Sequence, residues 1–215
     1  MSFKDNFSAN GSSASFISLW ISTHRRSYVT ALAFDQFSKL PETLEPTLTE
    51  VIKFVGHSND PTDTKRFNWK DFKAALDHYP GADLTFDMFK TTVVSQTDPT
   101  AVSMVVKKIA HGGDLHELET TIEATFTHLK EKKEKGVADF SKGSSEENSS
   151  WEYRAVFAIP LADLSNYFYG LVMTIKLEGD VEDEESWDLR GSTPRNFSAT
   201  IDLMRLVVTA GLRDP

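Results

Sequence analysis

The chain of 215 residues contains no cysteine. This absence excludes disulfide bonds, thiolate catalysis and zinc sites built on cysteine, and it leaves the redox compartment undetermined. No run of residues approaches the roughly 18–20 apolar residues of a membrane-spanning helix. The apolar segment 16–22 is too short and too rich in serine for the core of a signal peptide. We therefore expect a protein that is soluble as folded and is released or secreted without a clear signal peptide.

Positive charge is also scarce, with 23 Lys and Arg residues against 32 Asp and Glu residues and a net charge of −9. Because nucleic acids are bound largely through Lys and Arg at the phosphates, this balance argues against a nucleic-acid partner. The catalytic patterns G-x-S-x-G, H-E-x-x-H and G-x-G-x-x-G are absent as well. We therefore predict that the protein is not an enzyme and has neither a cofactor nor an obligatory small-molecule substrate.

Two groups of potential metal ligands have simpler interpretations. His111 and His116 flank two glycines and an aspartate, which is more typical of surface or capping histidines than of a metal pair. The acidic cluster within 180–185 lacks the ligand order and the central glycine of an EF-hand. We interpret it as a solvated hairpin tip, because like charges packed this densely prefer water. The sequence thus predicts no metal site.

Four segments have the three- and four-residue apolar spacing of amphipathic helices. The first, 41–56, has Pro46 near its start and Gly56 as its expected stop, and the second, 67–79, ends at Pro80. The other two, 99–111 and 114–130, are joined by a double glycine and are expected to form a hairpin. The apolar stripe of this hairpin consists of Val102, Val105, Val106, Ile109, Leu115, Leu118, Ile122, Phe126 and Leu129.

The last third of the chain is expected to form strands, at 148–160, 166–187 and 196–208. In the middle one every second residue from Tyr167 to Leu177 is apolar or aromatic, whereas Thr174 and Lys176 lie on the other face. The composition of segment 15–34 predicts a strand, or a strand with a short continuation, and 141–150 has the composition of a loop that separates helices from strands. Helices and strands each need an apolar partner, so a single α/β layered domain is the simplest arrangement.

Several blocks of the sequence resemble a known family. NSSWEYRAVFAIP, NYFYGLV, RNFSATIDLMRLVV, PETLEPTLTEVIKF and NWKDFKAALDHYPGADLTFD are similar, in matching order over residues 40–208, to volvatoxin-like fungal cytolysins. Through these, the chain resembles the bacterial cytolytic δ-endotoxins, or Cyt toxins. The resemblance implies a single-domain, three-layer α/β fold in which two α-helical hairpins flank a central, mostly antiparallel β-sheet.

The resemblance also implies an activity. It predicts a protein that binds the lipid of a target cell membrane, is dimeric in solution, forms larger oligomers on the membrane and makes pores with its C-terminal strands. A charged side chain facing lipid at the centre of a barrel costs about 2–4 kcal/mol, so the apolar face of each strand should meet the bilayer. The predicted insertion residues are Tyr153, Ala155, Phe157, Ile159, Tyr167, Tyr169, Leu171, Met173, Ile175, Leu177, Phe197, Ala199, Ile201 and Leu203.

Three points stay open at this level. Arg205 breaks the apolar pattern and marks a membrane interface, a bulge or a sheet that is covered on both sides. Residues 1–37 are expected to be an extension, a propeptide or dimer arm, ahead of a Cyt-like domain at 38–215. The polar helix expected at 114–130 leaves a second function possible, that of a non-lytic or inhibitory relative that binds a lytic partner or lipid without inserting.

Overall fold

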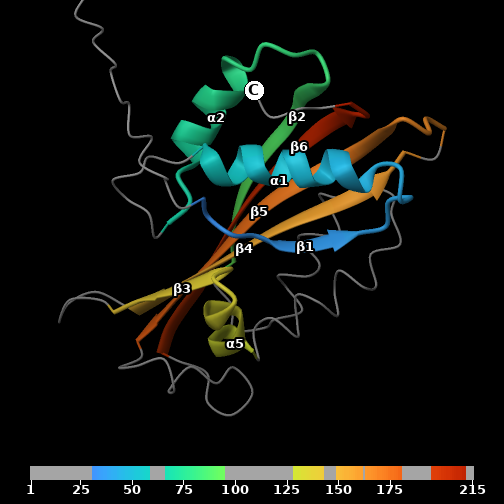
Figure 1. The fold of residues 1–215 in the computed structure, drawn as a ribbon. Helices are drawn as coiled ribbons and strands as arrows, with labels where there is room; N and C mark the ends of the chain where they lie inside the picture. Colours follow the sequence, from blue (N-terminus) through green and yellow to red (C-terminus); the bar gives the residue numbers. More distant parts are fainter. Residues whose placement is uncertain are drawn as a thin grey trace, which may run out of the picture.

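The computed structural model describes residues 31–58, 66–94, 128–142, 149–161, 163–180 and 195–211. These residues form one six-stranded sheet with helices packed on both of its faces (Figure 1). The strands are β1 (Asp35–Ser38), β2 (Leu84–Val94), β3 (Ala138–Ser141), β4 (Ser149–Pro160), β5 (Tyr167–Asp180) and β6 (Arg195–Thr209). The helices are α1 (Glu45–His57), α2 (Trp69–Asp77) and α5 (Leu129–Glu134).

The strand order is β1-β4-β5-β6-β2, and β3 pairs with β4 beside β1. Every pairing is antiparallel except that of β1 with β4, which is parallel. The long strands β4, β5 and β6 lie in the middle of the sheet, as Figure 1 shows. The predicted single-domain, mostly antiparallel α/β architecture is therefore confirmed.

Side chains alternate between the two faces of the sheet along each strand. In β4, β5 and β6 the odd-numbered residues share the face on which Leu129 of α5 packs, here called the α5 face. The even-numbered residues share the opposite face, which α1 and α2 cover and which is here called the α1 face. Each face has its own buried apolar cluster, so the sheet is the middle layer of the described structure.

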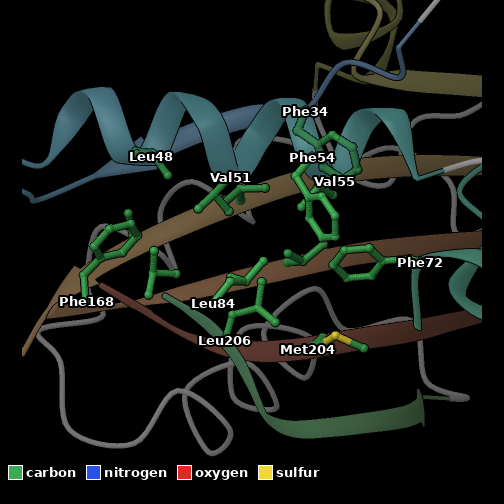
Figure 2. Close-up of a cluster of buried hydrophobic side chains, with 14 of the residues drawn as sticks. Phe34, Leu48, Val51, Phe54, Val55, Phe72, Leu84, Phe168, Met204 and Leu206 are labelled. Carbon is green, nitrogen blue, oxygen red and sulfur yellow. The ribbon is translucent and has the colours of Figure 1, made fainter. Parts of the chain in front are cut away.

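Helix α1 packs on the sheet through a regular apolar stripe. Pro46 stands in its first turn, where a missing N–H is harmless. Leu48, Val51 and Val55 are at most 2% exposed. Figure 2 shows these side chains above Phe168, which is buried on β5. The helix predicted at 41–56 is confirmed.

Helix α2 begins at a side-chain cap. Asn68 Oδ1 accepts hydrogen bonds from the backbone N–H of Lys70 and Asp71, at 3.0 and 3.3 Å. Phe72 is fully buried, and its ring lies 6.1 Å from that of Phe54 on α1. The second predicted helix is confirmed as well, and its apolar residues join the α1-face cluster.

Other predictions were incomplete or wrong. Most of the strand predicted at 15–34 lies outside the described residues; its described end, 31–34, is not a strand, and β1 begins one residue later. β2 and β3 were not predicted, so helices and strands interleave along the chain. Gly56 does not stop α1, which continues to His57. A Cβ at Gly56 would lie 2.7 Å from the carbonyl oxygen of Leu32, so a close backbone approach explains this glycine.

The expected long helix at 114–130 does not continue into Leu129. His128, with φ −134° and ψ 31°, precedes Leu129 as the non-helical N-cap of α5. The other stripe residues of the predicted hairpin, from Val102 to Phe126, lie outside the described residues, as do His111, His116 and cluster residues 181–185. The expected domain boundary after residue 37 falls inside β1.

Candidate functional site

The α5 face of the sheet is apolar over three successive cross-strand rows. Each row has one residue from β4, one from β5 and one from β6. The rows are Trp151–Leu177–Ala199, Tyr153–Ile175–Ile201 and Ala155–Met173–Leu203. All nine side chains are at most 1% exposed. The centre of this face is therefore a continuous apolar surface within the fold.

The two ends of this surface differ from its centre. Trp151 occupies one end, packs on Phe140 of β3, and has a buried indole N–H without a hydrogen-bond partner among the described residues. At the other end Ile159 pairs with Tyr169, and both are partly exposed. The apolar surface is thus bordered by an aromatic side chain at each end.

Arg205 is the charged exception on the α5 face. It pairs with Met88 across a β-bulge of β2, in which Asp87 is the additional residue. The Arg205 guanidinium forms an ion pair with the Asp87 carboxylate and lies 4.9 Å from the centre of the Tyr169 ring. A bulge, one of the alternatives left open by the sequence, therefore accompanies this break in the pattern, and it lies in the neighbouring strand.

The α1 face of the same strands is divided into two halves. Val156, Val172 and Met204 form the first row of an apolar half, which α1 and α2 cover. The other half is polar over three rows, which are Arg154–Thr174–Asp202, Glu152–Lys176–Thr200 and Ser150–Glu178–Ser198. In this half the strands have one apolar and one polar face.

A buried ionic network lies within the polar half. Arg154, whose side chain is 1% exposed, forms ion pairs with Asp139 at 2.6 Å and Glu152 at 3.3 Å. Its guanidinium also donates to the carbonyl oxygens of Ala33 and Gly136, at 3.2 and 2.9 Å. This single side chain therefore joins β4 to β3 and to the segments that precede β1 and β3.

Burial raises the pKa of Glu152 above its ordinary value, and the hydrogen bond from the N–H of Phe67 and the charge of Arg154 oppose part of this effect. The Glu152 carboxylate accepts that backbone hydrogen bond at 2.7 Å. Trp69 Nε1 donates to Thr174 Oγ1 at 2.9 Å, and Arg66 donates to Ser150 Oγ at 2.8 Å. Segment 66–69 thus covers the polar half through Arg66, Phe67 and Trp69, and Asn68 caps the helix that begins there.

A second polar contact holds β1 against α5. Asp35 accepts a hydrogen bond from Tyr153 Oη at 2.9 Å and forms an ion pair with Lys132. The Lys132 ammonium also lies 6.0 Å from the centre of the Phe37 ring, which stacks on Phe157 at 4.7 Å. The edge of the α5-face cluster is therefore fixed by contacts among β1, β4 and α5.

The structure brings most of the predicted insertion residues together on one face. Of these, Tyr153, Ala155, Phe157, Leu171, Met173, Ile175, Leu177, Ala199, Ile201 and Leu203 are buried in the α5-face cluster, and Leu129 packs there from α5. Ile159, Tyr167 and Tyr169 share the parity of this face and are partly exposed. Phe197 lies in β6, but its side chain is outside the described set.

Sequence reasoning missed several residues of this region. Trp151 continues the same odd-numbered series two residues before Tyr153, so the alternation itself could have identified it. The buried pair Glu152 and Arg154 occupies positions that alternation assigns to an exposed face. Asp87 belongs to a strand that was not predicted. Nothing in the sequence indicates the partners of Glu152, Arg154 and Asp87.

None of the helices described in the structure has the length and hydropathy needed to cross a membrane. Within the same described ranges, no three His, Asp or Glu side chains are grouped so as to hold a metal ion.

The fold is similar to solved structures of delta-endotoxins. No family model matches the sequence, and no curated protein matches it. A delta-endotoxin structure is 17% identical, with a TM-score of 0.67, and the match covers 82% of this chain and 81% of that one. The activated Cyt2Ba monomer from Bacillus thuringiensis subsp. israelensis is 12% identical, with a TM-score of 0.64 and coverage of 82% and 97%. The chain therefore has the fold of the Cyt δ-endotoxins.

Proposed function

We propose that this protein is a pore-forming cytolysin of the Cyt toxin type, which binds lipid, oligomerises and inserts β4, β5 and β6 into a target membrane. The observation that supports this most directly is the α5 face, whose central rows are wholly apolar while the same strands have a polar half on the α1 face. A membrane-inserted sheet needs this combination, with lipid on one side and water on the other.

The length of the apolar face of β4 agrees with the proposal, although Arg205 of β6 interrupts the same face in the row Phe157–Leu171–Arg205. From Trp151 to Ile159, β4 runs for nine residues, and nine to eleven residues are typical of a membrane-spanning strand. At about 3.3 Å per residue this segment is about 30 Å long, or about 21 Å across the bilayer at a tilt of about 45°. The apolar band of a barrel is about 25 Å tall and has aromatic residues at both borders, as Trp151 and Tyr169 would provide.

Insertion requires the covering elements to leave. On the α5 face, Leu129 must separate from β4, and the ion pair between Asp35 and Lys132 must break. On the α1 face, segment 66–69 must release Thr174 and Glu152. The resting fold is thus the closed form of the proposed pore.

The proposal includes finer assignments. The sequence blocks that resemble volvatoxin-like fungal cytolysins support membership of the Cyt toxin family, a target in membrane lipid without an enzymatic step, and release of the protein before it acts. A dimer in solution and removal of residues 1–37 before insertion are part of the same proposal. Removal of residues 1–37 would take away Phe34, which is 4% exposed in the α1-face cluster, together with most of β1.

The first test is release of a trapped dye from phosphatidylcholine vesicles with and without sphingomyelin. The protein is added intact and after limited proteolysis. We expect release together with SDS-resistant oligomers. Tight binding to vesicles without release would instead indicate the non-lytic function, and absence of both binding and release from folded protein would refute the proposal.

The second test asks which face meets lipid. Since the chain has no cysteine, single cysteines at Ile175, Lys176, Leu177 and Glu178 can each carry an environment-sensitive fluorophore. We expect lipid-borne nitroxides to quench positions 175 and 177 and to spare positions 176 and 178. Each even position is the matched control for its odd neighbour. Equal quenching at all four would contradict insertion of β5 as a two-faced strand.

A further inference from the structure

The outer edge of β4 is covered by two short, separate strands. β5 pairs with all twelve residues of β4 along the inner edge. Along the outer edge, β3 covers residues 150–153 and β1 covers residues 155–158, with four residues each. An exposed strand edge is a template for pairing with another chain, so such a divided cover protects a surface capable of assembly.

Arg154 stands between the two covering strands and holds both. Its guanidinium binds the carbonyl oxygen of Ala33, two residues before β1. It also binds Asp139 within β3 and the carbonyl oxygen of Gly136, two residues before β3. The backbone N–H of Arg154 donates to the carbonyl oxygen of Val137 at 2.9 Å. Loss of this one set of contacts would weaken the attachment of β1 and β3 together.

The opposite edge of the sheet offers a complementary strand. β2 has eleven residues, and among the described elements it pairs only with β6. Because β4, β5, β6 and β2 alternate in direction, β2 of a second copy would lie antiparallel to β4 of the first. By contrast, β1 forms the sheet's parallel pairing with β4 over only four residues, and parallel pairing is slightly less stable per residue.

We propose that the outer edge of β4 is the assembly surface for a second copy of this chain, whose β2 replaces β1 and β3. The inference rests on the proposed function, because it specifies how the membrane-bound oligomer is built. The contact joins two different edges, so it is head-to-tail and can be repeated from copy to copy. Arg154 is the positioning residue that keeps the surface closed in the resting fold.

Engineered disulfides test whether the edge must open. Ser38 and Ala158 are register partners of β1 and β4, so S38C/A158C should keep β1 in place. Ser141 and Ser150 are partners of β3 and β4, and S141C/S150C is a second variant in case the first fails to fold. The matched control, K176C/T200C, joins β5 to β6 and leaves the β4 edge unaffected.

Each variant is mixed with phosphatidylcholine and sphingomyelin vesicles, oxidised or reduced, and oligomers are counted after chemical cross-linking. We expect oxidation of either edge variant to reduce the oligomer yield at least tenfold, reduction to restore it, and the control to be unaffected. Equal yields from oxidised edge variants and the control would overturn the inference. So would the absence of oligomers from every form, whereas dye release by those monomers would still support membrane permeabilisation and would remove only oligomerisation from the proposed function.

A mixing experiment identifies the partner strand. Lys90 pairs with Leu203 and so lies on the α5 face of β2. Copies with K90C are mixed with copies that have one cysteine at Tyr153, Ala155 or Phe157 on the same face of β4. We expect disulfides between copies at one of these positions, and only after vesicles are added. Cysteine at Ile175, on the same face of β5, is the control, and equal cross-linking there would overturn the assignment of β2.

Discussion

Replacing Arg154 with methionine is expected to lower the free energy of unfolding by about 3–5 kcal/mol, the range for breaking a buried ion pair from one side. The Arg154 side chain is 1% exposed, and the Glu152 side chain is 11% exposed. Methionine fills much of the same volume but removes the donors to Glu152, to Asp139 and to two backbone carbonyl oxygens. The carboxylate of Glu152 would then be buried without its cationic partner.

The matched control is the same substitution at Arg205. Its side chain is 17% exposed, and its partner Asp87 is 35% exposed, so solvent screens the pair. A pair of this kind contributes about 0–1 kcal/mol. With a urea m-value of about 2 kcal/mol/M, the unfolding midpoint should fall by about 1.5–2.5 M for Arg154→Met and by less than about 0.5 M for Arg205→Met.

The reasoning fails if Arg154→Met lowers stability by less than about 1 kcal/mol, or if both variants shift the midpoint equally. A second substitution checks the cause. Glu152→Leu, introduced into Arg154→Met, should recover part of the lost stability because it removes the uncompensated charge. If the double variant is less stable than the single variant by the full effect of Glu152→Leu alone, the two side chains are not coupled.

Three further predictions concern the protonation of Glu152, the packing of Phe72 and the close backbone approach at Gly56. Because burial raises the pKa of Glu152 in the folded state, its contribution to the free energy of unfolding is present below its ordinary pKa and is lost as pH rises through the raised value. Glu152→Gln should therefore flatten this decline in stability with pH, as urea titrations would show. Phe72→Ala should lower the free energy of unfolding by about 3–5 kcal/mol, and Leu164→Ala, at a side chain 48% exposed, by less than about 0.5 kcal/mol. Gly56→Ala would ordinarily stabilise a helix by about 1 kcal/mol, but contact with the carbonyl of Leu32 should make it destabilising, as thermal melting would reveal.

The long strands could be predicted because apolar residues recur at every second position along them. β5 has an apolar residue at every odd position from Tyr167 to Leu177, and a period of two can form only one apolar face on a strand. The same rule placed β4 and β6 on that face, and the register confirms it. The helical spacing of α1 and the Asn68 cap of α2 are equally local signals.

The missed strands lack such signals. β1 and β3 have four residues each, too few for a period to be distinguished from chance. β2 is longer, but the bulge at Asp87 shifts its alternation, so even-numbered residues lie on the α1 face before the bulge and on the α5 face after it. Its partner β6 lies more than a hundred residues away in the sequence. Pairing at that distance is determined by the whole sheet rather than by the segment itself.

The buried ions of β4 were not predictable for a related reason. Alternation assigns Glu152 and Arg154 to a polar face, and a polar face is ordinarily solvated. Segment 66–69 covers Glu152 through the N–H of Phe67, and the segments that precede β1 and β3 cover Arg154 through the carbonyl oxygens of Ala33 and Gly136. A single sequence predicts which face a side chain occupies but not which distant segment covers that face.

This cover determines where the proposed opening must begin. The three polar rows that would face water in a pore are covered in the resting fold by segment 66–69, through Ser150, Glu152 and Thr174. The apolar half of the α1 face is covered by α1, which has no comparable set of side-chain hydrogen bonds to the strands among the described contacts. Water can replace the polar contacts at little cost, and releasing the segment exposes mainly Phe67 of the α1-face cluster. Separating α1 would expose Leu48, Val51, Phe54 and Val55, which is unfavourable in water and favourable only in lipid. Opening should therefore start at segment 66–69, before α1 separates from the sheet.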